Sequence, residues 1–165
     1  MLTRPSVALP ILLLGLPGCG PGAGGRAPGS TLPPAEARRD LPCRPLLQSQ
    51  TSGWTQPATF VVDDPVAWER FWSRHKGRAV PAPARPAVAF ASEVVLVAAL
   101  GERPSQGNSV AFGAIVGDGR GGVDAEVRVG APDPGSVTAS SRTSPVAAVA
   151  IPRPEGAVRF TRVPD

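Results

Sequence analysis

The chain has 165 residues, which is enough for one folded domain. Its 19 Gly and 21 Pro make up about a quarter of the sequence, and residues 17–34 alone hold six Gly and five Pro, so part of the chain is predicted to lie outside that domain. Seventeen basic and 13 acidic residues give a net charge of +4, and there are one His and two Cys. These counts argue against a Cys/His metal site, a disulfide-dense fold and a His-based catalytic triad.

Residues 1–18 have the layout of a secretory signal peptide. Arg4 lies in a short polar start, an apolar stretch over residues 7–16 follows, and small residues precede Cys19. The apolar stretch of about ten residues is half of what a membrane-spanning helix needs. We therefore predict an exported protein without a transmembrane helix in this segment.

Leu16-Pro17-Gly18-Cys19 resembles the bacterial lipobox. The resemblance implies cleavage before Cys19 and diacylglycerol on its thiol, so that the protein is anchored to a membrane of the cell envelope and faces the periplasm or the exterior. No Asp follows Cys19, as in lipoproteins retained at the outer membrane. The alternative is an ordinary secreted protein, in which Cys19 and Cys43 pair or stay free. With Cys19 acylated, Cys43 would be a structural thiol or form an intermolecular disulfide.

Residues 20–40 are rich in Gly and Pro, and the first fifteen of them show no apolar period. Such a segment buries too little apolar surface to offset the entropy of ordering. We interpret it as a flexible linker that holds the body near the membrane.

From residue 58 onward the pattern predicts one helix followed by short strands. Residues 58–62 read as a strand, after which Asp63-Asp64 offers an acidic N-cap for a helix over 65–75 that begins with Pro65. The apolar stripe of this helix, which we expect to anchor the core, consists of Val66, Trp68, Phe71 and Trp72.

The later strands are apolar runs separated by turn residues. Residues 93–100 hold the most apolar run, typical of a central strand buried on both faces. Two runs on either side of the Gly-rich turn at 117–122 predict a hairpin. The remaining expected strands and the two hairpin strands are 88–90, 110–116, 123–129, 146–151 and 158–163.

No connection after residue 90 has room for a crossover helix, which favours antiparallel pairing. The expected fold is α+β and mainly antiparallel β, with one N-terminal helix packed on a sheet of five or six short strands.

Motifs of the common catalytic and cofactor sites are missing. The sequence holds no CxxC, HExxH, P-loop or GxSxG, and no GxGxxG between a strand and a helix. His75 is expected to be a solvated residue at the helix C-terminus. An enzyme built on carboxylates would need Asp63 with Asp64, or Glu93 with Glu102, which read as cap, strand-edge and loop residues. We therefore predict no enzyme activity, metal, cofactor or small-molecule ligand.

The arginines late in the chain are predicted to be partly exposed, Arg159 among them because it alternates with Val158 and Phe160. They do not form the dense basic stripe, interleaved with aromatics, that nucleic-acid binding needs. Anionic surface polymers, lipid headgroups or an acidic partner suit them better. These arginines are Arg142, Arg153, Arg159 and Arg162.

Two stretches resemble the PrcB C-terminal domain family. Residues 100–107 read LGERPSQG after a Val-rich strand, and Thr143-Ser144-Pro145 precedes another strand. The family pattern is a G-x-x-P-(S/T)-G-G-(aromatic) loop followed by a Thr-Ser-Pro-(aromatic) stretch. This chain departs from it at Gln106, Asn108 and Val146, which stand where the pattern has Gly, an aromatic residue and Tyr.

The family takes its name from a lipoprotein subunit of a bacterial surface protease complex, so the resemblance implies a non-catalytic partner of a surface or secreted protease. We expect residues 1–18 to be the lipoprotein signal peptide, 19–57 the lipidated Cys and linker, and 58–165 the β-rich domain. The protein would then be an accessory or stabilising protease subunit, held to membrane lipid through Cys19. The candidate partner-binding loop consists of Gly101, Glu102, Arg103, Pro104, Ser105, Gln106, Gly107 and Asn108.

A protease inhibitor is the alternative function. Arg103-Pro104 would be the Pro-stiffened segment that enters the active site of the enzyme.

Overall fold

The computed structural model describes residues 38–76, 83–132, 135 and 139–165. The predicted signal peptide, Cys19 and most of the predicted linker lie outside these residues. The described chain forms eight strands and one helix. In chain order the elements are β1 (Arg39–Asp40), β2 (Arg44–Ser49), β3 (Ala58–Val62), α1 (Pro65–Lys76), β4 (Glu93–Ala99), β5 (Ser109–Gly117), β6 (Val123–Gly130), β7 (Val146–Pro152) and β8 (Val158–Pro164).

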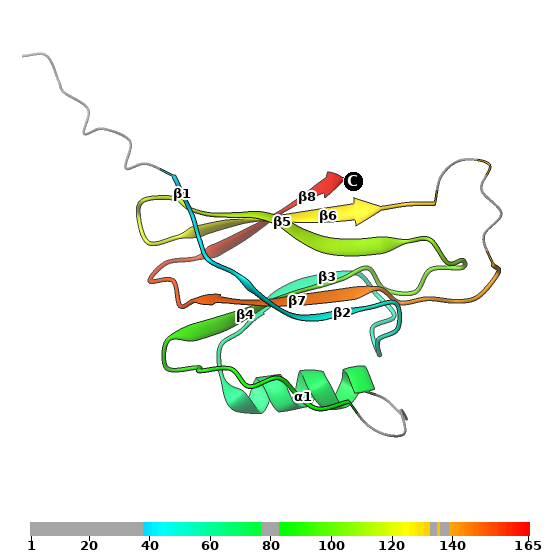
Figure 1. The fold of residues 1–165 in the computed structure, drawn as a ribbon, viewed down its shortest axis with the longest axis horizontal. Helices are drawn as coiled ribbons and strands as arrows, with labels where there is room; N and C mark the ends of the chain where they lie inside the picture. The colour runs from blue at the N-terminus through cyan, green and yellow to red at the C-terminus, as the bar shows by residue number, and fades with distance from the viewer. Residues whose placement is uncertain (1–37, 77–82, 133–134, 136–138) are drawn as a thin grey trace, which may run out of the picture. The chain divides into compact units, whose positions relative to one another are not determined.

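The strands form two four-stranded sheets that face each other, with the helix on the outside of one of them (Figure 1). Sheet A has the strand order β1-β5-β6-β8, and sheet B has the order β2-β7-β4-β3. Helix α1 packs against the face of sheet B that points away from sheet A. Sheet B is therefore the middle of three layers.

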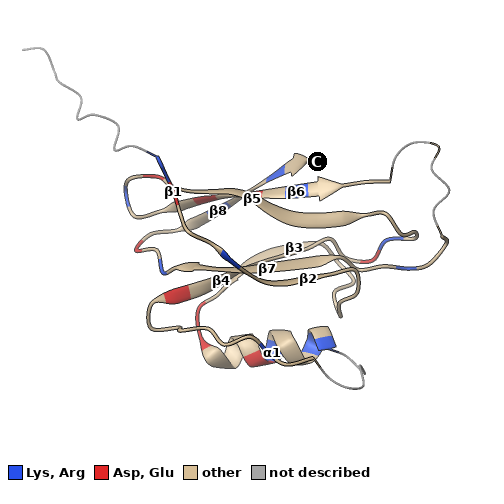
Figure 2. Cartoon of the chain, viewed as in Figure 1, with Lys and Arg blue, Asp and Glu red and all other residues tan. Residues whose placement is uncertain are grey.

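The middle position of sheet B explains its continuous apolar strands. Along β4, Val95 and Val97 face the helix and join the cluster around Trp68, whereas Val94 and Leu96 face sheet A. A strand with one solvated face would alternate apolar and polar residues, but this one is covered on both faces. The prediction of a central strand buried on both sides is confirmed, and β7 likewise carries no charge (Figure 2).

Helix α1 begins where the sequence predicts. The carboxylate of Asp64 accepts the backbone N–H groups of Val66 and Ala67 at 2.7 and 2.8 Å, and Pro65 occupies the first helical position. Of the predicted apolar stripe, three aromatic residues are buried, while Val66 is 58% exposed. The buried members of the stripe are Trp68, Phe71 and Trp72.

The expectation of five or six strands was too low. Strands β1 and β2 lie in the stretch assigned to the linker, yet β1 pairs with the end of β5, and β2 pairs with β7 from Arg44 to Ser49. Pro42 and Pro45 interrupt this stretch and hide its strand pattern, but the proline positions are tolerated because both strands lie at sheet edges.

The expected strand over residues 88–90 was wrong. This segment runs without strand pairing into a turn at Phe90. Val88 and Phe90 are apolar because they pack against the helix-side core, not because they belong to a sheet.

The expectation of antiparallel pairing holds for every strand pair except one. Strands β6 and β8 are parallel, with Val123 opposite Val158 and Val129 opposite Pro164. The argument from connection length assumed that a parallel pair needs a helical crossover. Here β7, a strand of the facing sheet, carries the chain back to the end of sheet A at which β6 begins.

His75 is half-buried, not solvated. The centre of its ring lies 5.3 Å from that of Trp72 and 6.4 Å from that of Phe71, and its Nδ1 has no hydrogen-bond partner among the described residues. Burial lowers the pKa of His75 below its ordinary value because the charged imidazolium is poorly solvated there. We expected the helix C-terminus to favour the charged form of His75, but desolvation lowers its pKa and so favours the neutral form.

Candidate partner-binding surface

The predicted loop 101–108 joins β4 to β5 at one end of the sandwich. Gly101 leaves β4 with φ at +73° and is buried, and a Cβ there would lie 2.7 Å from the carbonyl carbon of Gln56 and 2.8 Å from the nitrogen of Pro57. Gly107 turns the chain back into β5 with φ at +88°. Both positions require glycine because of their positive φ, and Gly101 also requires it because a Cβ would clash with neighbouring backbone atoms.

The Thr-Ser-Pro stretch lies against this loop. Arg103 and Thr143 form an antiparallel bridge in which each backbone N–H donates to the other residue's carbonyl, at 2.8 and 3.0 Å. The hydroxyl of Thr143 donates to the carbonyl of Ser105 at 3.0 Å. The two sequence motifs that carry the family resemblance therefore meet in space and hold each other.

A third segment, residues 50–56, completes the arrangement. The buried hydroxyl of Ser144 accepts the N–H of Ser52 at 2.6 Å and donates to its carbonyl at 2.7 Å. On the other side, the N–H of Glu102 donates to the carbonyl of Thr55 at 3.1 Å. We call segments 50–56, 101–108 and 139–145 together the three-loop end.

The fixed backbone of loop 101–108 leaves several side chains on the surface. Arg103, Ser105 and Asn108 are half-buried, and the Asn108 side-chain amide donates to the carbonyl of Ser105 at 3.1 Å. Asn108, which stands where the family pattern has an aromatic residue, is thus used inside the loop. The members exposed to solvent are Glu102, Pro104, Gln106 and Gly107.

The described chain begins at the opposite end of the sandwich. Strand β1 pairs with Gly117 and Val116 at the far end of β5, whereas loop 101–108 joins β5 at Ser109 (Figure 1). The three-loop end therefore lies one strand length away from the point where the N-terminal segment enters the domain.

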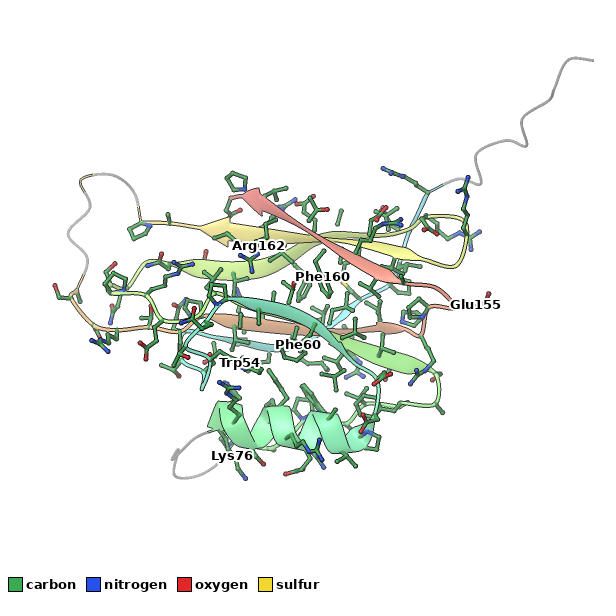
Figure 3. The ribbon with its side chains drawn as sticks, turned by 180° about the vertical axis from the view of Figure 1, so that it is seen from behind. Trp54, Phe60, Lys76, Glu155, Phe160 and Arg162 are labelled. Atoms are coloured by element: carbon green, nitrogen blue, oxygen red, sulfur yellow. The ribbon has the colours of Figure 1, made fainter. Side chains whose placement is uncertain are left out.

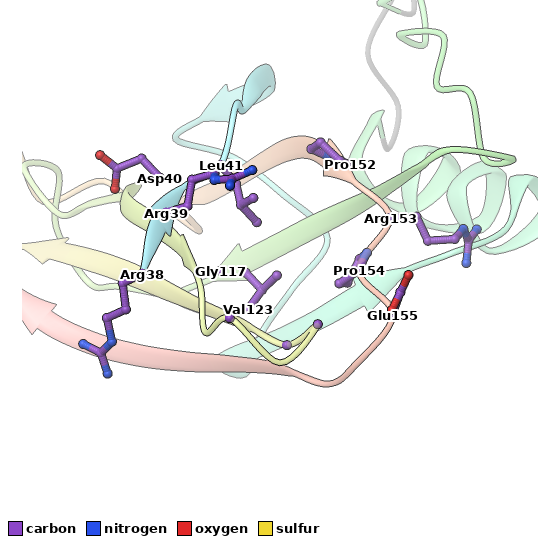
Figure 4. A pocket seen from close by; sticks show the side chains of 13 residues that line it. Arg38, Arg39, Asp40, Leu41, Gly117, Val123, Pro152, Arg153, Pro154 and Glu155 are labelled. Atoms are coloured by element: carbon purple, nitrogen blue, oxygen red, sulfur yellow. The ribbon is translucent and has the colours of Figure 1, made fainter. Parts of the chain in front are cut away.

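The entry end carries a cavity of about 910 Å³ that the sequence did not predict (Figure 4). It lies between the start of the described chain, the Gly-rich turn 117–122 and the connection from β7 to β8. The turn itself was predicted, but its position beside Pro152–Glu155 depends on the pairing of β6 with β8. The main residues that line the cavity are Arg38, Arg39, Leu41, Arg153, Pro154 and Glu155.

The carboxylate of Asp118 accepts hydrogen bonds from backbone N–H groups of its own Gly-rich turn. It accepts the N–H groups of Arg120 and Gly122, each at 2.8 Å, and the guanidinium of Arg159 at 3.0 Å. These hydrogen bonds, that from Arg120 above all, lower the pKa of Asp118. The amides of Arg120 and Gly122 are therefore not free to bind an anion in the cavity.

The carboxylates considered for an enzyme are not brought together. Asp64 caps α1, Glu93 binds Arg44 at 3.0 Å, and Glu102 lies at the other end of β4 beside Arg142. The pKa of Glu93 is lowered by the N–H of Ala89 and then by Arg44. Within the described ranges no three His, Cys, Asp or Glu residues are grouped as metal ligands.

Two further predictions concern the membrane and the thiols. Cys43 is exposed and carries a free thiol, whereas Cys19 lies outside the described residues. In the part of the chain that the structure describes, no helix is long and apolar enough to cross a membrane.

The late arginines are distributed over both ends. The guanidinium Nη1 of Arg142 lies 3.7 Å from the carboxylate Oε2 of Glu102, and the Nε of Arg159 lies 2.7 Å from the carboxylate Oδ1 of Asp124. Arg153 donates to the backbone carbonyls of Asp63 and Phe90, at 2.7 and 2.6 Å. Arg162 lines a small pocket near the three-loop end.

Comparison with known proteins finds a family match. The family model described as PrcB C-terminal matches residues 94–152, from β4 through β7, and so includes both motifs of the three-loop end. No curated protein and no solved structure matches the chain. The match to residues 94–152 confirms the predicted resemblance to the PrcB C-terminal family.

Proposed function

We propose that the protein is a membrane-anchored bacterial lipoprotein whose folded domain is non-catalytic and binds another protein, as an accessory or stabilising subunit of a surface protease. The match to the PrcB C-terminal family supports the association with a protease complex. The lipobox-like sequence ending at Cys19 supports the anchor.

The placement of the three-loop end carries the proposal. A chain held through its N-terminal segment enters the domain at β1, and β5 separates this point from loop 101–108 by nine residues. At about 3.4 Å per residue, that strand spans about 30 Å. The exposed side chains of Glu102, Pro104 and Gln106 are therefore presented away from the attachment point, where a second protein can reach them.

The rigidity of the loop supports a binding role. Its backbone is hydrogen-bonded to Thr55, Ala139 and Thr143 before any partner arrives. A surface that is already ordered loses little conformational entropy on binding, which is one of the main costs of association.

The same geometry weighs against the inhibitor. An inhibitory segment must offer extended backbone to the enzyme, but the N–H and carbonyl of Arg103 are both bonded to Thr143. The Arg103 side chain is also half-buried, with its Nε enclosed. A bond between Arg103 and Pro104 is therefore poorly placed for an active site.

Site-specific photo-crosslinking in intact cells tests the binding role. A photoreactive residue at Gln106 is expected to crosslink a secreted or surface protease, because this position lies at the exposed tip of the three-loop end. The matched position is Arg120, which is also exposed but lies at the entry end. Equal products from both positions, or no protease among the products from position 106, would contradict the proposal.

Metabolic labelling with a fatty acid tests the anchor separately. The wild-type chain is expected to incorporate the label and to fractionate with membranes, and Cys19→Ala to do neither. Label that persists in Cys19→Ala would place the lipid elsewhere.

A further inference from the structure

Most arginines of the described strands have a carboxylate within reach. Arg44 pairs with Glu93, Arg128 with Glu126, and Arg159 with Asp118 and Asp124. Several other arginines have neither a side-chain hydrogen bond nor a carboxylate partner within the described residues, and two of them, Arg103 and Arg162, lie at or near the three-loop end. Arg103 is half-buried, so its side chain loses hydration without gaining a hydrogen bond in exchange, whereas Arg162 is exposed.

These two arginines line the same pocket. It has a volume of about 360 Å³ and lies where the β4 end of loop 101–108 faces the end of β8. Leu100, which is 2% exposed, and Val129 supply apolar walls. The pocket therefore combines two unpaired cations with an apolar lining.

The direction of Arg162 follows from the strand. Residues 160 and 162 lie on one face of β8, and Phe160 packs into the core between the sheets (Figure 3). Arg162 thus lies on the same side of β8 as Phe160 and lines the pocket from a strand at the edge of sheet A, where it remains exposed to solvent. From the other side, the Nε of Arg103 is buried and has no hydrogen-bond partner in the part of the chain that the structure describes.

The local charge favours an anion. Two guanidinium groups on one pocket repel each other, and a shared anion removes that repulsion. Asp165, three residues after Arg162, lies near enough to Arg128 to help raise the pKa of that residue. Each guanidinium presents a planar fork of donors that matches a carboxylate.

We propose that the Arg103–Arg162 pocket binds the carboxylate of an Asp or Glu side chain of the partner protein, with a neighbouring apolar residue of that partner against Leu100 and Val129. This inference rests on the proposed function, because Arg103 belongs to the loop that meets the partner. A carboxylate fits better than a phosphate because the backbone N–H of Arg103 is already bonded to Thr143 and adds no donor.

Peptide titration tests the pocket without the partner. The full chain, purified in a zwitterionic detergent, is titrated with acetyl-Leu-Glu-Leu-amide, and the arginine Nε–H signals are followed by NMR. We expect saturable shifts of the Arg103 and Arg162 signals up to about 10 mM peptide, ten times a dissociation constant of about 1 mM. Arg162→Gln should weaken binding about tenfold. Arg39→Gln, at the entry end, should leave it unchanged.

Each other outcome overturns the proposal. Equal shifts with acetyl-Leu-Gln-Leu-amide would show that the carboxylate is not recognised, and equal shifts with inorganic phosphate would reveal a general anion site. No shifts would leave Arg162 as an exposed charge that protects an edge strand against pairing. Thermal unfolding of Arg162→Gln, with Arg162→Lys as a second variant, separates lost binding from lost folding. Because no protease is present, failure here is distinct from failure of the crosslink at Gln106.

Discussion

Gly101 is the residue on which the position of the candidate loop most depends. Its φ of +73° is strained for any other residue, and a Cβ would meet the backbone of Gln56 and Pro57 at 2.7 and 2.8 Å. Backbone atoms cannot move aside as the end of a flexible side chain can. We expect Gly101→Ala to lower the free energy of unfolding by roughly 3 kcal/mol, measured by urea denaturation.

Gly135 provides the matched control for that substitution. Its φ is +90°, but a Cβ there would meet nothing within 4 Å. Gly135→Ala should therefore cost only the conformational strain of about 1 kcal/mol. Equal losses for the two variants would mean that the close contact with Gln56 and Pro57 does not contribute.

The burial of His75 makes the stability of the domain depend on pH. Its pKa is lowered in the folded state because desolvation penalises the charged ring. Just below pH 6.5, the ordinary pKa of His, the unfolded chain therefore binds more protons than the folded one, and stability falls as the pH is lowered through this window. We expect the urea midpoint to decrease between about pH 7.5 and pH 5.5.

The chain offers a direct control because His75 is its only histidine. His75→Gln should have a nearly flat stability profile over the same pH window. A wild-type slope that persists in His75→Gln would assign the effect to another group.

At the scale of elements, the start of α1 depends on one carboxylate. Asp64 accepts two backbone N–H groups that would otherwise lack partners in the first turn of the helix. Asp64→Ala should reduce the free energy of unfolding by about 1 kcal/mol, whereas Asp63→Ala, one residue earlier and also exposed, should change it little. Chemical denaturation of both variants measures the difference, and equal effects would refute the assignment of the cap.

Several elements were predictable because local signals and tertiary environment agree. The cap and the aromatic stripe predicted α1, and the Gly-rich turn between two apolar runs predicted the hairpin of β5 and β6. The predicted strand over residues 88–90 was wrong because alternating apolar residues also occur in a loop that packs against a core. Strand β2 was missed because an edge strand that holds prolines carries a weak pattern of its own.

The candidate site was predictable in part. The sequence identified loop 101–108 and the Thr-Ser-Pro stretch, but residues 50–56 carry no motif, and their contact with Ser144 depends on the pairing of β2 with β7. Arg162 was predicted to be at least partly exposed, which is confirmed, but its place in the same pocket as Arg103 depends on which face of β8 meets the core.

For the whole molecule, the arrangement of the sheets makes distant segments depend on one another. Strand β2, near the start of the described chain, covers one edge of β7, and β8, at its end, covers the edge of β6. The family match spans only β4 through β7. It therefore omits both edge strands of each sheet, β1 and β8 in sheet A and β2 and β3 in sheet B. Neither sheet is complete without residues that lie outside the match.

We therefore expect residues 94–152 alone not to fold. In that fragment β4 and β7 would lose their neighbours β3 and β2, the edge strands of sheet B, and also the aromatic residues of α1 that pack on the outer face of this sheet. Residues 38–165 should show dispersed amide NMR signals and a cooperative thermal transition, and the fragment neither. A cooperative transition in the fragment would mean that the space between the sheets, around Leu96 and Ile115, is sufficient to stabilise the domain without its helix-side core.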